Sequence, residues 1–182
     1  AVEVVEFAPG PQAGFGQSKM PGVVLGPPSG RGAGGGSLDV VSLGVGGSIT
    51  LGFGDEGLVD GPGPDFVVFE NPFWVKNDPA LVYAELAQVS VSEDGETWSV
   101  FPCDPEPNEA AQWPGCAGWT PTQMYDPFAV VPLDAEVSGG DAFDLSELGI
   151  ERAKYVRIED LETDTTSPSS AGFDLDAVGV VR

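Results

Sequence analysis

Short apolar runs separated by glycine, proline and polar residues recur along the whole chain. Residues 2–7 predict a first strand, and residues 153–160 alternate apolar and polar positions, as expected for a strand with one buried face. Residues 66–69 (Phe-Val-Val-Phe) are continuously apolar, which predicts a central strand covered on both faces. The only helical turn that we expect lies at residues 145–148. The pattern predicts an all-β protein.

Turn residues between apolar runs predict two hairpins. Residues 38–43 and 48–53 flank a glycine-rich turn, and residues 89–92 and 98–101 flank a turn built on Asp94-Gly95. We expect Trp98, which begins the returning strand of the second hairpin, to lie in the core.

The composition supports this fold class and excludes some classes of partner. The 182 residues are 41% hydrophobic and contain no evident linker, so we expect one domain spanning residues 1–182. The 26 glycines and 17 prolines favour short strands joined by tight turns. The formal net charge of -22 repels phosphate backbones and anionic lipids, which excludes nucleic acid as a partner. No run approaches the roughly 20 apolar residues of a membrane helix, so direct membrane insertion is not expected.

The absence of histidine excludes many catalytic arrangements, because histidine is the usual general base and the commonest zinc ligand. The sequence also contains no Gly-x-Ser-x-Gly elbow and no phosphate-binding loop. We therefore expect a protein that is not an enzyme. A carboxylate-dependent hydrolase is the third interpretation, because an acidic chain always offers carboxylate pairs, although nothing singles out one pair.

Two cysteines, Cys103 and Cys116, lie in a loop rich in proline, glycine and tryptophan. Their spacing closes a short ring without Cys-x-x-Cys redox character, which predicts a disulfide and an oxidising compartment. A secreted or cell-surface protein is expected, and the chain that starts at Ala1 would be a mature form whose leader has been removed. The alternative is a pair of unlinked thiols in a cytosolic protein.

Oxygen-bearing side chains flank the predicted central strand. Asp60 and Asp65 precede residues 66–69, and Glu70 and Asn71 follow them. Calcium takes six to eight oxygen ligands, and carboxylates buried without a partner would be costly. We predict at least one calcium ion with ligands among Asp60, Asp65, Glu70, Asn71, Asp141, Asp144, Asp174 and Asp176. The alternative is that these residues only form turns and end strands.

Aromatic residues gather near the cysteines. Trp113 and Trp119 lie within the cysteine-containing loop region, and Tyr125 lies just beyond it. A rigid loop that presents aromatic faces suits stacking against a sugar or contact with a protein, so these three residues are the predicted ligand-binding residues. The alternative is a small core beneath the loop.

Three segments carry a family resemblance: residues 90–98 (Ser-Val-Ser-Glu-Asp-Gly-Glu-Thr-Trp), 155–158 (Tyr-Val-Arg-Ile) and 172–178 (Gly-Phe-Asp-Leu-Asp-Ala-Val). In this order they resemble the galactose-binding-like, or discoidin-like, jelly roll. With residues 36–44 and 60–71, the chain is also similar to cell-surface proteins and lipoproteins of bacteria. The resemblance implies a secreted β-sandwich of about eight or more strands and says little about its ligand.

The resemblance also implies a structural calcium with an acidic ligand on the closing strand. Asp176 matches that position best and Asp174 is the second choice, while Glu3 and Glu6 are both candidates for the amino-terminal ligands.

These observations predict a non-catalytic, calcium-binding, extracellular β-sandwich that acts as a binding or adhesion module. Its expected partner is a glycan or another surface protein. The alternative is a structural subunit of an extracellular filament or surface layer, assembled by strand addition through residues 2–7 or the Gly/Pro-rich loop of residues 9–36.

Overall fold

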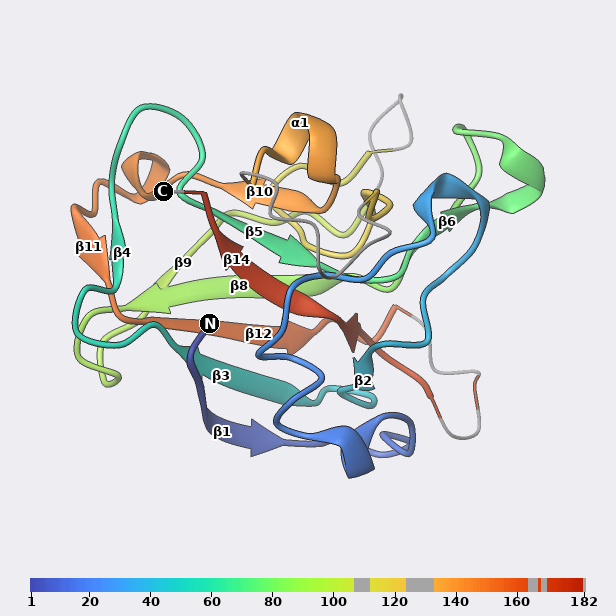
Figure 1. Ribbon diagram of the computed structural model, residues 1–182, viewed down its shortest axis with the longest axis horizontal. Helices are drawn as coiled ribbons and strands as arrows, with labels where there is room; N and C mark the ends of the chain where they lie inside the picture. Colours follow the sequence, from blue (N-terminus) through green and yellow to red (C-terminus); the bar gives the residue numbers. More distant parts are fainter. Residues whose placement is uncertain (107–111, 124–132, 164–166, 168–169, 182) are drawn as a thin grey trace.

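The computed structural model describes residues 1–106, 112–123, 133–163, 167 and 170–181 (Figure 1). This part of the chain forms several antiparallel sheets and almost no helix, which confirms the all-β prediction. The largest sheet has five strands in the order β1 (Glu3–Ala8), β3 (Ser48–Gly52), β12 (Tyr155–Asp160), β8 (Ala87–Ser92) and β9 (Ser99–Val100).

The other sheets are smaller. A three-stranded sheet has the order β10 (Asp141–Phe143), β5 (Phe66–Phe69) and β14 (Ala177–Val180). The remaining strands form the pairs β11 (Arg152–Ala153) with β4 (Leu58–Val59), β13 (Asp174–Leu175) with β2 (Val41–Ser42), and β6 (Phe73–Trp74) with β7 (Val82–Tyr83). The helical elements are α1 (Ala135–Ser138) and the 3-10 turns η1 (Gln17–Lys19), η2 (Gly32–Gly34), η3 (Val75–Asn77) and η4 (Leu145–Leu148).

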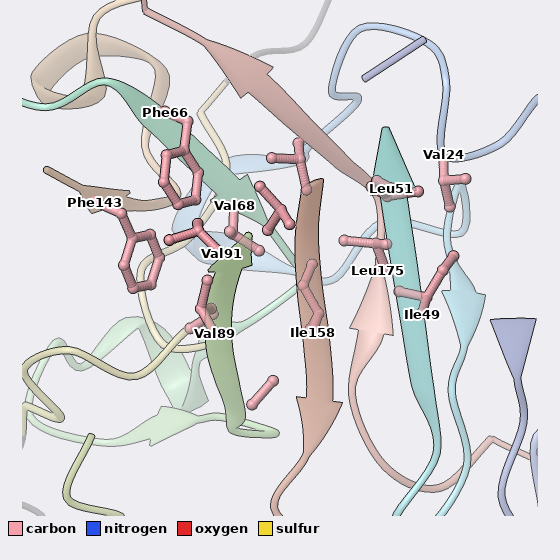
Figure 2. Packing of buried hydrophobic residues seen from close by; sticks show 14 of the residues in the cluster. Val24, Ile49, Leu51, Phe66, Val68, Val89, Val91, Phe143, Ile158 and Leu175 are labelled. Carbon is pink, nitrogen blue, oxygen red and sulfur yellow. The ribbon is translucent and has the colours of Figure 1, made fainter. Parts of the chain in front are cut away.

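The main apolar core lies between these layers (Figure 2). Side chains of β5 and β10 meet those of the five-stranded sheet there; the labelled residues include Phe66, Val68, Val89, Val91, Phe143, Ile158, Ile49, Leu51 and Leu175. A smaller cluster of Val67, Phe69 and Ala177 covers the opposite face of β5. Strand β5 is therefore apolar on both faces, as the sequence predicts, and the layered arrangement is compatible with a β-sandwich.

One predicted hairpin is confirmed and the other is wrong. Strands β8 and β9 pair antiparallel around the turn at residues 93–98. Strand β2 does not pair with β3; it pairs with β13, whereas β3 lies between β1 and β12. The chain leaves one sheet for another at the turn of residues 44–47, so the apolar side chains of β2 and β3 enter the core from different sheets.

Two local expectations have different outcomes. The helical turn expected at residues 145–148 is η4. Trp98 is partly exposed rather than core, and its ring lies against the Arg157 guanidinium, with 3.9 Å between the guanidinium carbon and the ring centre. Arg157 lies on the solvent-facing side of β12, and its interaction with the Trp98 ring places that ring on the outer surface of the sheet.

The cysteine prediction is confirmed: Cys103 and Cys116 form a disulfide, with 4.7 Å between their Cα atoms. Among the residues described, no helix is long and apolar enough to cross a membrane.

Candidate metal centre

Four buried carboxylates lie near the end of β5, within electrostatic reach of one another, although no three of them bring oxygens within 4.8 Å of one another. Glu70 follows β5, Asp141 begins β10, Asp174 begins β13, and Glu85 lies just before β8. Their residues are only 2%, 5%, 8% and 3% exposed, in that order. The charges of the other three all act on Glu70, which places the four side chains in one electrostatic neighbourhood. We call this group the acidic centre.

Strand pairing explains why residues so distant in sequence meet. Asp141 lies opposite Val68 in the β10–β5 ladder, and Ala177 lies opposite Phe69 in the β14–β5 ladder. The chain entering β10 passes close to β5, because a Cβ on Gly140 would lie 2.7 Å from the Phe69 ring. Gly140 also has φ +78°, so a glycine is required there on two grounds.

The segment that follows the disulfide closes the centre. Ala117 and Ala87 exchange backbone hydrogen bonds of 3.0 Å, and a Cβ on Gly118 would lie 2.0 Å from the Glu85 carbonyl oxygen. The Thr122 hydroxyl donates to the Glu70 carbonyl oxygen at 2.8 Å. Residues 117–122 are thus fixed to the elements that carry Glu70 and Glu85.

Several oxygens of the acidic centre have no hydrogen-bond partner in the described part of the chain. Asp141 Oδ2 accepts hydrogen bonds from the backbone N–H groups of Gly118 and Trp119 at 2.7 and 3.1 Å, but Asp141 Oδ1 accepts none. Asp174 Oδ1 and both oxygens of Glu70 also lack a partner. Buried polar atoms are normally satisfied, and a buried charge without a partner is strongly unfavourable.

Burial shifts the acidity of these groups. It raises the pKa of Glu70 well above its usual value, and the negative charges of Asp174 and Glu85 raise it further, while the nearby backbone N–H of Asn71 lowers it. Burial also raises the pKa of Asp141 to about 6, although hydrogen bonds from residues 118–120 oppose the shift. It raises the pKa of Asp174 to about 6 as well. The centre therefore favours either a bound proton or a cation over free negative charge.

Asn71 lies beside this group. Its side-chain amide nitrogen donates to the Ser37 carbonyl oxygen at 2.9 Å, and its side chain is close enough to Asp174 to lower the pKa of that carboxyl group. Asn71 therefore lies at the edge of the acidic centre.

A second acidic group consists of Asp60, Asp65 and Asp144, which offer oxygens within 4.8 Å of one another. This group could hold a metal ion. The buried Asp65, however, already accepts hydrogen bonds from the backbone N–H groups of Gly61 (3.0 Å) and Leu145 (2.8 Å). Asp144 similarly accepts from Ser146 N at 2.9 Å, capping η4. Both residues have a structural function in turns without an ion.

Asp176 is fully buried but has a different charged neighbour. Its Oδ2 accepts from the Ser29 backbone N–H at 2.9 Å, while Oδ1 has no partner within the described ranges. Burial raises its pKa to about 7, and the charge of Asp39 adds to that shift. The eight predicted metal ligands thus divide among three places, of which the acidic centre brings together Glu70, Asn71, Asp141 and Asp174.

The sequence analysis missed Glu85. A signal was available, because Glu85 is a single carboxylate within the apolar run Ala84-Glu85-Leu86-Ala87. Glu3 and Glu6, the candidate amino-terminal ligands, are exposed on the edge strand β1.

The predicted aromatic residues lie in different surroundings. The Trp119 ring N–H donates to the Cys116 carbonyl oxygen at 3.1 Å, and Trp119 lines a surface groove with Trp74. The Trp113 ring N–H instead donates to the Pro105 carbonyl oxygen at 3.0 Å. Tyr125 lies outside the described residues.

No protein-family model matches this chain, and searches of characterised proteins and of solved structures found no match. The resemblance to the galactose-binding-like jelly roll therefore depends on its sequence motifs. The structure supports the coarser description of antiparallel sheets compatible with a β-sandwich.

Proposed function

We propose that this protein is an extracellular, non-catalytic binding module whose β core is stabilised by calcium at the acidic centre. The observation that carries the proposal is Glu70, a 2% exposed carboxylate whose two oxygens have no hydrogen-bond partner in the described ranges. Three further buried carboxylates lie near enough for their charges to raise its pKa. A divalent cation is the simplest way to offset so much buried negative charge.

The donor set favours calcium over other metals. All side-chain donors of the centre are oxygens, whereas zinc and copper prefer nitrogen and sulfur ligands. Magnesium usually retains several water molecules and requires near-octahedral geometry. Calcium accepts several carboxylates, in monodentate or bidentate fashion, which suits a buried site formed by four separate segments.

The extracellular location is supported by two features. The Cys103–Cys116 disulfide fits an oxidising compartment. The net charge of -22 attracts divalent cations, and extracellular modules bind calcium at the millimolar concentrations found outside cells.

Calorimetric titration of the chelator-treated chain with calcium chloride tests the metal centre, with magnesium chloride titrated separately. We expect saturable calcium binding and a higher melting temperature in calcium. Glu70→Gln should abolish both effects, whereas the control Asp60→Asn should retain them. Absence of binding heat and of any thermal shift in millimolar calcium would overturn the proposal.

A second candidate function is a subunit assembled by strand addition. It is favoured by β1, which is an edge strand with the 64% exposed Val2 before it and the 50% exposed Val5 within it. Edge strands offer backbone groups to other chains. Size-exclusion chromatography with light scattering, with and without calcium, distinguishes the two functions. A monomer supports the binding module. Large assemblies that are dispersed by Val5→Glu support the subunit.

A further inference from the structure

A groove on the surface lies next to the acidic centre. Its volume is about 210 Å³, and its described lining includes Trp74, Val82, Gln112, Trp119, Thr120 and Pro121. Both tryptophans are partly exposed. The sequence analysis considered Trp119 as a ligand-binding residue but did not link it to Trp74, which is 45 positions away in the printed sequence.

Trp119 forms one wall of the groove, and two hydrogen bonds fix its position. Its backbone N–H donates to Asp141 of the acidic centre at 3.1 Å, and its ring N–H donates to the Cys116 carbonyl oxygen at 3.1 Å. Cys116 is itself fixed by the disulfide to Cys103. The position of this indole therefore depends on both the acidic centre and the disulfide loop.

The Trp74 wall also begins at the acidic centre. Trp74 lies in β6, four positions after Glu70, and β6 pairs with β7 through Phe73 and Tyr83. The rings of Phe73 and Tyr83 stack with 5.2 Å between their centres. A short, braced segment thus connects Trp74 to Glu70.

We propose that this groove binds a neutral saccharide and that calcium at the acidic centre sets the separation of its two tryptophan walls. This inference rests on the proposed function, because it assigns a ligand class to the same module and makes its metal regulatory. An ion bound at the centre would contact Asp141, which accepts the Trp119 backbone N–H, and Glu70, which lies four positions before Trp74.

The chemistry of the groove selects the ligand class. Indole faces pack against the apolar face of a sugar ring, and the polar residues that line the groove, Thr120 and Gln112, are neutral. None of the described lining residues is charged, and the net charge of -22 disfavours anionic ligands. The groove is smaller than the roughly 300–1,000 Å³ of pockets that enclose drug-sized ligands, which suits one or two rings of a longer chain.

Calorimetry with cellohexaose, xylohexaose and mannohexaose tests the inference, first in calcium and then with excess chelator. We expect at least one of these neutral sugars to bind the calcium-loaded protein and to lose about tenfold or more in affinity with chelator, a change of about 1.4 kcal/mol. Trp74→Ala and Trp119→Ala should each weaken binding by a similar factor. The matched control is Trp98→Ala, a partly exposed tryptophan outside the groove lining, which should leave the affinity unchanged.

Folding of each variant is checked by its melting temperature and calcium titration, and Trp119→Phe should retain part of the affinity by keeping an aromatic face. On the unmodified protein, the binding sugar should change tryptophan fluorescence saturably. Calcium binding without binding of any of the three sugars overturns the inference and leaves the proposed metal centre intact. Sugar binding without calcium binding overturns the proposed function and the calcium coupling. Sugar affinity unchanged in both tryptophan variants overturns the groove assignment, as does binding of a proline-rich peptide in place of every sugar.

Discussion

Asp141 Oδ2 accepts a 2.7 Å hydrogen bond from the Gly118 backbone N–H, while Asp141 Oδ1 has no hydrogen-bond partner among the described residues. One oxygen of this carboxylate therefore anchors the segment after the disulfide, and the other remains for the acidic centre. The two functions are separable, because asparagine keeps one side-chain oxygen whereas alanine removes both.

Asp141→Asn should separate them. The amide oxygen can still accept from Gly118, but the amide nitrogen that replaces Oδ1 cannot bind a cation. We expect calcium affinity to fall at least about tenfold, with little loss of stability in chelator. Asp141→Ala should in addition lower the free energy of unfolding in chelator by about 1–3 kcal/mol, because it leaves the buried N–H of Gly118 without an acceptor. Calcium calorimetry and urea unfolding measure both effects; equal calcium affinity in Asp141→Asn and the unmodified protein would contradict the assignment.

The effect of Glu70→Gln on the free energy of unfolding should have opposite signs with and without calcium. In chelator the substitution removes a carboxyl group that folding must bury either protonated or charged, and it should raise the free energy of unfolding by on the order of 1 kcal/mol. In calcium it should lower that free energy relative to the unmodified protein, because an ion at about 100 times its Kd contributes about 2.7 kcal/mol.

Urea unfolding in both conditions tests this reversal, with the exposed Glu96→Gln as control. The control should show no reversal. A Glu70→Gln protein that is less stable in both conditions would mean that Glu70 has a structural partner rather than a cation.

The strands were more predictable than the site. Residues 66–69 are continuously apolar, so the burial of β5 on both faces could be predicted from the local sequence pattern. The pairing of β2 with β13 was not predictable from the local pattern, because residues 38–53 also fit a hairpin. The observed pairing depends on β13, which is distant in the sequence. Glu70, Asp174 and Asp176 were predicted as ligands because they adjoin apolar strands, and this remains a prediction.

The separation of the predicted ligands into three places is a tertiary property. Alternation placed Asp174 and Asp176 on one face, yet Asp174 joins the acidic centre while Asp176 bonds to Ser29 of the Gly/Pro-rich loop. The path of that loop depends on contacts with several strands, which no local pattern encodes.

Asp65→Asn tests the second acidic group. Asparagine keeps one acceptor oxygen, but its amide nitrogen would face the backbone N–H of Gly61 or Leu145, so we expect a loss of about 1–3 kcal/mol in the free energy of unfolding. The loss should be the same in calcium and in chelator. Asp60→Asn, on the exposed member of the group, should change stability little. Reduced calcium affinity in both variants would instead place an ion at Asp60, Asp65 and Asp144.

The calcium-free protein should lose stability as the pH rises from about 4 to about 7. Folding raises the pKa of Asp141 and Asp174 from the usual 3.8 to about 6 and that of Asp176 to about 7, so in this range the folded state binds protons that the unfolded chain has released. Stability is then complete below the unfolded pKa and decreases as the pH rises through the folded values. A two-unit shift of a single group corresponds to about 3 kcal/mol at most.

Urea unfolding across this pH range in chelator, at high constant salt to screen the general charge repulsion, measures the decrease. Calcium should flatten the curve, because it competes with protons for the same oxygens. Asp174→Asn should reduce the slope in chelator, since an amide does not titrate, whereas the exposed Glu96→Gln should not. Stability that rises with pH in chelator would show that the buried carboxylates are ionised and paired in the folded protein, and would remove the electrostatic basis for a cation at the acidic centre.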